Sequence, residues 1–159
     1  MANGSSLVEA GLLELNLTRR VAVPPEIVFR AWVESEHVAQ WWGPKGFTNP
    51  MCELDARVGG AIRIDMRAPS GVVHPMIGRF VEIDRPHRLV FKACPLDEEG
   101  RPIMEVLNSV TFTEVRGGTE ITLVATVTMK TPAAEKSIAG MSQGWGESLD
   151  RLAELVRQM

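Results

Sequence analysis

The chain has 159 residues, of which 45% are apolar and 23% are charged, and its formal net charge is −3. This length matches one ordinary domain, and the composition falls in the normal globular range. The 17 basic and 20 acidic residues are balanced and form no basic run, which argues against a phosphate-tracking surface. We therefore do not expect nucleic acid as a partner.

The N-terminal residues and the cysteines predict a compartment. Residues 1–11 are small and polar, lack the basic and long apolar regions of a signal peptide, and are expected to form a loose leader. No stretch approaches the roughly 20 apolar residues of a membrane span, so membrane insertion is not expected. Cys52 and Cys94 lack CxxC spacing and fit free thiols in a reducing compartment. We therefore expect a soluble cytoplasmic protein with one domain, residues 12–159.

The first predicted elements are a strand and two short helices. Residues 12–23 alternate between apolar and polar side chains, which predicts a strand with one buried face. Pro24-Pro25 ends this strand and suits the first turn of a helix. Ser35 is expected to cap a second short helix, which stops at Gly43-Pro44.

The middle of the chain reads as a series of strands. Clusters of Gly, Pro and Asp mark turns, and short turns between successive strands indicate an antiparallel meander. The six predicted strands are 47–56, 61–67, 73–83, 88–94, 103–115 and 119–129.

A long helix is predicted to close the chain. Thr131-Pro132 suits the N-cap and first position of this helix, and Glu147 and Arg151 have the spacing of an i,i+4 ion pair. Its apolar residues recur at spacings of three and four: Ile138, Met141, Trp145, Leu149, Leu152 and Val156. The predicted fold is α+β, a seven-stranded antiparallel sheet with this helix across its apolar face.

Several blocks of sequence, in this order, resemble one known family. They are WWGPKGF (41–47), ELDARVGGAIRIDM (53–66), GRFVEIDRPHRLVF (78–91), GGTEITL (117–123) and GWGESLDRLAELV (144–156). The chain resembles, from about residue 13 to 157, the family named for homology to the C-terminal domain of the activator of Hsp90 ATPase. That family belongs to the START-like superfamily, which includes polyketide cyclases and Bet v 1. The resemblance implies a helix-grip fold, in which a curved antiparallel sheet wraps the long C-terminal helix and leaves a cavity.

The same resemblance implies three kinds of function. Superfamily members bind hydrophobic small molecules, some catalyse cyclisation or aromatisation, and a few act on chaperones. We expect a small apolar or amphiphilic ligand as the partner. A chaperone ATPase is not expected, because the Hsp90-activating members carry an additional N-terminal domain. Exposed strand edges or the short helices offer contacts for a homodimer.

Polar residues on otherwise apolar faces are the first candidates for ligand contacts. Arg19, Arg79 and Asn108 each share parity with apolar neighbours on a predicted strand. Burying such groups without partners is costly. For the arginines, a stem that lies on the sheet with its head in water is the main alternative to a ligand contact. For Asn108 the structural and the ligand-binding interpretations stay equally open.

The closing helix supplies further candidates. Gly140, Gly144 and Gly146 each cost roughly 1 kcal/mol relative to alanine in a helix interior, which suggests either close backbone packing or vacant space. Methionines on the strands fit a wall that adapts to a ligand. The predicted cavity residues are Trp41, Met66, His74, Met76, Arg79, Met104, Asn108, Phe112, Met141, Trp145 and Leu149.

The adjacent tryptophans pose a separate question, because neighbouring residues cannot share one face of a helix. We expect Trp42, beside Gly43-Pro44, to pack under the following loop. Trp41 is then expected to line the cavity entrance or to pack against the start of the closing helix. An internal contact is favoured for both rings over an exposed patch.

Catalytic, metal and cofactor signals are weak. The three histidines form no HxH, HxxxH or His/Cys cluster, so no metal site is expected. Gly59-Gly60 precedes a strand and reads as a turn, and we expect no cofactor. A cyclase or aromatase needs an acid or base held near substrate, for which His74, Asp65 and Glu82 are candidates. None has an evident partner in the sequence, so binding is favoured over catalysis.

Overall fold

The computed structural model describes residues 13–159, and the predicted leader, residues 1–11, lies outside them. The described strands are β1 (Leu13–Val21), β2 (Thr48–Leu54), β3 (Ala61–Arg67), β4 (Val73–Asp84), β5 (Arg88–Pro95), β6 (Met104–Val115) and β7 (Gly118–Lys130). The described helices are α1 (Pro25–Val33), α2 (Ser35–Trp41), the 3-10 turn η1 (Pro132–Ala134), α3 (Glu135–Ala139) and α4 (Met141–Val156).

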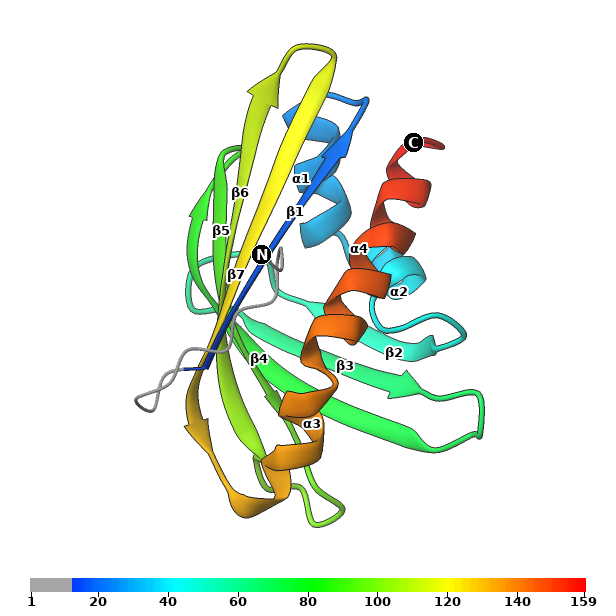
Figure 1. The fold of residues 1–159 in the computed structure, drawn as a ribbon, viewed down its shortest axis with the longest axis vertical. Coiled ribbons are helices and arrows are strands. Elements are labelled where there is room, and N and C mark those ends of the chain that lie inside the picture. The colour runs from blue at the N-terminus through cyan, green and yellow to red at the C-terminus, as the bar shows by residue number, and fades with distance from the viewer. Residues whose placement is uncertain (1–12) are drawn as a thin grey trace.

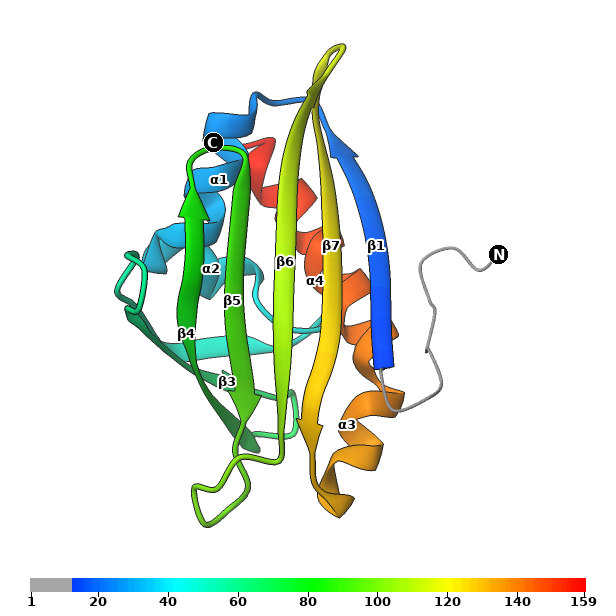
Figure 2. The same cartoon turned by 90° about the vertical axis from the view of Figure 1, so that its left-hand side faces the viewer.

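The strands form one antiparallel seven-stranded sheet in the order β1-β7-β6-β5-β4-β3-β2. Strands β2 to β7 follow one another as hairpins, and β1 pairs with β7 at the far edge. The helices lie on one face of the curved sheet (Figure 1), and Figure 2 looks onto the opposite face. The predicted α+β helix-grip fold is confirmed.

The C-terminal helical region differs from the single predicted helix. It is divided into η1, α3 and α4, with Gly140 at the junction between α3 and α4. The Thr131 side chain makes no cap contact, because its Oγ1 donates to the Ile103 carbonyl oxygen at 2.7 Å. Thr131 does occupy the predicted N-cap position, at the start of η1, with Pro132 as the first residue, but without a side-chain cap bond. The hydroxyl instead ties the end of β7 to the loop before β6.

The N-cap position assigned to Ser35 is wrong. Glu34 occupies the N-cap position of α2 and makes no side-chain cap bond, while Ser35 is the first residue of the helix. The Ser35 hydroxyl accepts a hydrogen bond from the Leu54 N–H at 3.1 Å. The contact joins α2 to the edge strand β2 and fixes the start of the segment that leads to Trp41.

A bulge in β4 reverses the side-chain parity on which one prediction depended. The register shifts between Phe80 and Glu82, so the residue between them has no partner in β5. Before the bulge the buried side chains are Met76 and Phe80, whereas Ile77 is 40% exposed. Arg79 shares the outward parity of Ile77 and is exposed. Its Nη1 donates to the Gly59 carbonyl oxygen at 3.0 Å, so this arginine lies away from the concave face.

Arg19 lies on the helix side of β1 but serves a structural contact. Its Nε donates to Asp150 Oδ1 at 3.0 Å, and its Nη2 donates to the Gly146 carbonyl oxygen at 3.3 Å. Both acceptors belong to α4. The arginine therefore connects the edge strand to the helix, with its charge paired at a partly exposed rim.

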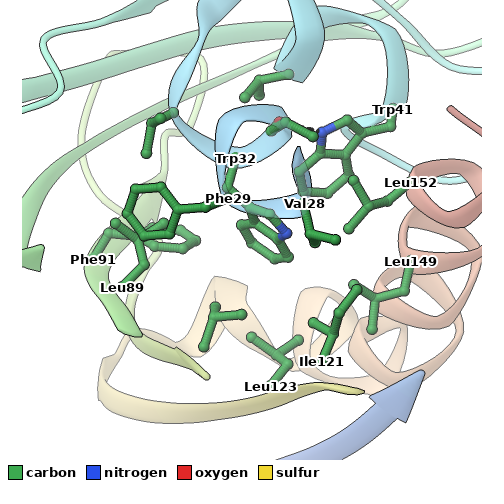
Figure 3. Packing of buried hydrophobic residues seen from close by; sticks show 14 of the residues in the cluster. Val28, Phe29, Trp32, Trp41, Leu89, Phe91, Ile121, Leu123, Leu149 and Leu152 are labelled. Atoms are coloured by element: carbon green, nitrogen blue, oxygen red, sulfur yellow. Dashed lines mark hydrogen bonds between the residues drawn. The ribbon is translucent and has the colours of Figure 1, made fainter. Parts of the chain in front are cut away.

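The main core fills one end of the space between sheet and helices. Trp32 of α1 lies in this core beside Trp41 (Figure 3), and the two rings pack edge-on with centroids 4.7 Å apart. Trp32 also packs edge-on against Phe112, at 6.1 Å. Leu149 and Leu152 of α4 reach this cluster and are fully buried. A smaller apolar cluster, built on Leu15, Met104, Val106, Ala125, Val127 and Ala134, lies elsewhere on the same face. Trp145 packs against both clusters.

Candidate functional site

A pocket of about 380 Å³ lies between the inner face of the sheet and the helical region around α3 and the start of α4. It is open to solvent on one side. Strands β3 to β6 contribute one wall, and the segment 42–47, the α2–β2 loop, contributes another. Its volume lies within the range of roughly 300–1,000 Å³ that is usual for small-molecule sites.

The uneven packing of α4 creates this space. Its buried residues are Ser148, Leu149, Leu152 and Val156, which lie from the middle of the helix onward. The first half carries Met141, Gly144 and Trp145, which line the pocket and are only partly buried. Because glycine has no side chain, the helix backbone lies beside an open volume there. The sheet and helix therefore mesh at one end and separate at the other.

Three residues of α4 hold the α2–β2 loop in place. The Arg151 guanidinium donates to the carbonyl oxygens of Gln40, Trp42, Gly43 and Pro44 at 2.9 to 3.2 Å. Glu147 Oε1 accepts from the Lys45 N–H, and Ser148 Oγ accepts from the Gly43 N–H, both at 3.0 Å. Partial burial lowers the pKa of Arg151. The predicted Glu147–Arg151 ion pair is absent from the described residues, since both side chains turn to the loop.

Gly43 is the position where this loop requires glycine. Its φ is +100°, a left-handed conformation that residues with a side chain rarely adopt. A Cβ on Gly43 would lie 2.7 Å from the Met66 sulfur, which is too close for any real contact. The loop can therefore approach β3 closely enough to form the pocket wall.

Apolar and sulfur-containing side chains dominate the pocket wall. Strands β3, β4 and β6 and helix α4 each contribute one thioether, from Met66, Met76, Met104 and Met141 respectively. Trp42 and Trp145 meet edge to face, with ring centroids 5.3 Å apart. Methionine is flexible and polarizable, so such a wall adapts to ligands of different shape.

A few polar groups interrupt the apolar wall. Asn108 on β6 and Ser148 on α4 are buried, whereas His74 and Lys136 are exposed and lie toward the solvent side. The lining residues within the described chain include no aspartate or glutamate. The site thus offers neutral hydrogen-bonding groups inside and basic groups at its mouth.

The structure brings seven of the predicted cavity residues together around this pocket. They are Met66, His74, Met76, Met104, Asn108, Met141 and Trp145. They come from β3, β4, β6 and α4, so up to 79 residues of sequence, from Met66 to Trp145, separate side chains that share one space.

Four predicted cavity residues lie elsewhere. Arg79 lies on the outward face because of the parity described above. Trp41, Phe112 and Leu149 belong to the main core, where each is at most 2% exposed. Phe112 packs edge-on against Phe29 at 5.5 Å, which completes the core beside α1. These three side chains contact the well-packed end of the molecule and not the open one.

One tryptophan of the pair lies in the core and the other at the pocket, but the two rings are exchanged relative to the prediction. Trp41 is 0% exposed, and its Nε1 donates to the Ala31 carbonyl oxygen at 2.8 Å, so it joins α2 to α1. Trp42 follows the end of α2 and lines the pocket. The expectation of internal contacts for both rings agrees with this arrangement, but the ring at the cavity is Trp42.

Sequence reasoning missed Ser148 and Phe47 as lining residues, together with most of the α2–β2 loop. Ser148 lies one helical turn after Gly144 and on the same helix face, so this spacing is a signal that could have identified it as a lining residue. Phe47 is the first residue of the predicted strand 47–56, whereas β2 begins at Thr48, and no local pattern shows that the loop folds back over β3.

Of the candidate acids and bases, only His74 lines the pocket. Asp65 has the opposite parity to the lining residue Met66, and Glu82 pairs with Arg88 at 3.2 Å. Within residues 13–159 no cluster of three or more His, Cys, Asp or Glu side chains could hold a metal ion. Burial raises the pKa of the Cys52 thiol to about 11 and also raises the pKa of Cys94, so both favour the unreactive thiol form.

Solved structures of several bacterial proteins share this architecture. A protein from Nitrosomonas europaea is 29% identical with a TM-score of 0.77, and the match covers 95% of this chain and 97% of that one. A protein from Chromobacterium violaceum is 28% identical with a TM-score of 0.75, covering 90% and 96%. The AHSA1 protein from Silicibacter pomeroyi is 25% identical with a TM-score of 0.78, covering 92% and 99%. No curated protein matches the chain.

The curved sheet, the gripped helix and the pocket between them define a helix-grip protein of the START-like class. Residues 22–157 match the model of the "Activator of Hsp90 ATPase homolog 1-like protein" family. The chain belongs to this family. Its fold commonly binds hydrophobic ligands. Within residues 13–159, no helix has the length and apolar character that crossing a membrane requires.

Proposed function

We propose that this protein binds a small apolar or amphiphilic molecule in the pocket between the sheet and the N-terminal half of α4. The observation that carries the proposal is the 380 Å³ volume beside Gly144 and Trp145, at the end where the two layers separate. A cavity of roughly 150 Å³ with an apolar wall already takes up benzene. This larger pocket has room for a molecule of two or more rings or for a short acyl chain.

The chemistry of the wall supports the same proposal. Two tryptophans and four methionines offer large apolar surfaces, and the few polar groups suit the orientation of a ligand. The basic groups His74 and Lys136 at the mouth favour an anionic or neutral head group over a cationic one. No observation favours a cyclase-type reaction or chaperone binding over this function.

The test uses 8-anilinonaphthalene-1-sulfonate, an apolar fluorophore with one anionic group. We expect saturable binding with enhanced fluorescence. The Met141→Trp variant fills the pocket from α4, and it should weaken binding by about tenfold or more, equivalent to roughly 1.4 kcal/mol. Met129→Trp is the matched control, because Met129 is 42% exposed and does not line the pocket.

Two outcomes of this experiment would contradict the proposal. Equal affinity in the two variants would place the probe outside the pocket and contradict the proposal. Absence of saturable binding to the wild type would contradict it as well. Mass spectrometry of the intact protein under native conditions then identifies any molecule that remains bound through purification.

A further inference from the structure

Asn108 is a buried amide with half of its hydrogen-bonding capacity unused. It lies on the inward face of β6, is 1% exposed, and lines the pocket. Its Nδ2 faces the carbonyl oxygens of Val106 and Phe91, at 3.3 and 3.5 Å. Its Oδ1 is buried and has no hydrogen-bond partner among the described residues.

The orientation of this amide follows from its neighbours. Carbonyl oxygens only accept hydrogen bonds, so the NH₂ group must face Val106 and Phe91. The oxygen is therefore the group left over, and it can only be satisfied by a hydrogen-bond donor. A buried acceptor without a donor costs about 1–3 kcal/mol, so the site gains most from a ligand that supplies one.

The surroundings of Asn108 leave this role to a ligand. Ser148 is the other buried polar residue of the pocket; its Oγ accepts from the Gly43 N–H, and its hydroxyl makes no hydrogen bond to Asn108 Oδ1. A single trapped water needs two to four polar partners, which this largely apolar wall does not supply around one amide oxygen. The methionines in the wall, Met104 among them, are flexible enough to let a ligand group reach Oδ1 from the pocket.

From these contacts we infer that the pocket selects apolar, ring-containing molecules that carry a hydroxyl group, which donates to Asn108 Oδ1. This inference rests on the proposed function and adds the ligand class to it. The hydroxyl lies at the buried end of the ligand, and the apolar body contacts the methionines and tryptophans. A molecule of the same shape without a donor leaves the amide oxygen unsatisfied and binds more weakly.

The experiment compares 2-naphthol with 2-methoxynaphthalene, which has the same rings and oxygen but no O–H. Titration calorimetry on the wild type should show 2-naphthol binding about tenfold more tightly. In Asn108→Leu the two affinities should become equal, mainly through weaker binding of 2-naphthol. Met129→Leu, at an exposed position outside the pocket, is the control and should keep the preference.

Three results would overturn the inference: equal affinities in the wild type, a preference that survives in Asn108→Leu, or a preference that disappears in Met129→Leu. If Asn108→Leu does not fold, a crystal structure of the wild type with 2-naphthol decides. The hydroxyl must then lie within about 3.2 Å of Oδ1. If neither naphthalene binds but 8-anilinonaphthalene-1-sulfonate does, the proposed function stands and this ligand class is wrong. If none of the three binds, the proposed function fails.

Discussion

Replacing Gly144 by alanine tests whether the first half of α4 keeps space free for a ligand. Gly144 lies inside the helix, where glycine costs about 1 kcal/mol relative to alanine. Among the described residues, a Cβ at this position meets only Pro44 Cγ, at 3.8 Å, which is an ordinary van der Waals contact. We therefore expect Gly144→Ala to raise the free energy of unfolding by about 0.5–1 kcal/mol and Tm by about 2–4 °C.

The same methyl group should weaken ligand binding. Gly144 lines the pocket, so its Cβ takes volume from any molecule that fills the space. We expect the affinity for 8-anilinonaphthalene-1-sulfonate to fall by about fivefold, equivalent to roughly 1 kcal/mol of crowding. The predicted signature is thus a more stable protein that binds less well.

Gly146→Ala is the matched control. It lies in the same helix but outside the pocket, and its Cβ would meet Arg19 Nη2 at 3.6 Å. We expect a similar gain in stability and unchanged probe binding. Urea unfolding and fluorescence titration of the three proteins supply both quantities. A Gly144→Ala variant that is less stable, or that binds the probe as the wild type does, would refute the idea that this glycine preserves space.

Three further predictions concern the loop, a thiol and an ion pair. Arg151→Met keeps the aliphatic stem but leaves three loop carbonyls and the Gln40 carbonyl of α2 without their donor, and should lower the free energy of unfolding in urea by about 2–3 kcal/mol. A loss below 0.5 kcal/mol, about the size of a neutral surface change, would mean that this contact does not hold the loop. Cys52 should react with a disulfide reagent about 100-fold more slowly in the folded protein than in the unfolded chain, because its pKa rises from 9.0 to about 11. The reaction is measured in a Cys94→Ser background, and equal rates in the two states would contradict the burial of Cys52. The hydrogen bond from Arg30 holds the pKa of the Glu34 carboxyl below its ordinary 4.5. The Arg30–Glu34 pair therefore makes its full contribution to stability above pH 4.5. This contribution should disappear as the pH falls through the lowered pKa of Glu34. Arg30→Leu should therefore flatten the curve of unfolding free energy against pH in this range. An unchanged curve would show that the pair does not contribute.

The strand order was predictable because the signals that define it are local. Turn residues divide residues 47–129 into runs, and alternation within the last run matches the observed inward side chains of β7, Ile121, Leu123, Ala125 and Val127. Parity counting failed in β4, where the bulge after Phe80 inserts an extra residue. No residue type marks that bulge, so Arg79 was placed on the wrong face.

The pocket was harder to predict, because it depends on how far two layers stand apart. Gly140 and Gly144, next to Met141 and Trp145, pointed to a cavity wall, and these residues do line the pocket. The same reasoning included Leu149, which periodicity places on the same helix face. It cannot show that the helix meets the sheet closely from Ser148 onward. For the tryptophan pair, the deciding fact is the Trp41–Ala31 hydrogen bond, a contact between two helices that no local pattern contains.

Two residues that lower the stability of the fold, Gly144 and Asn108, line the same pocket. Gly144 weakens the helix on one side of the pocket, and the unpaired oxygen of Asn108 is a penalty on the other. Alanine at the first position and leucine at the second are simple replacements that would remove these penalties. Deviations from the most stable choice concentrate where function requires them. Because the two deviations are chemically independent but face one volume, a ligand that fills the volume and donates to the amide accounts for both.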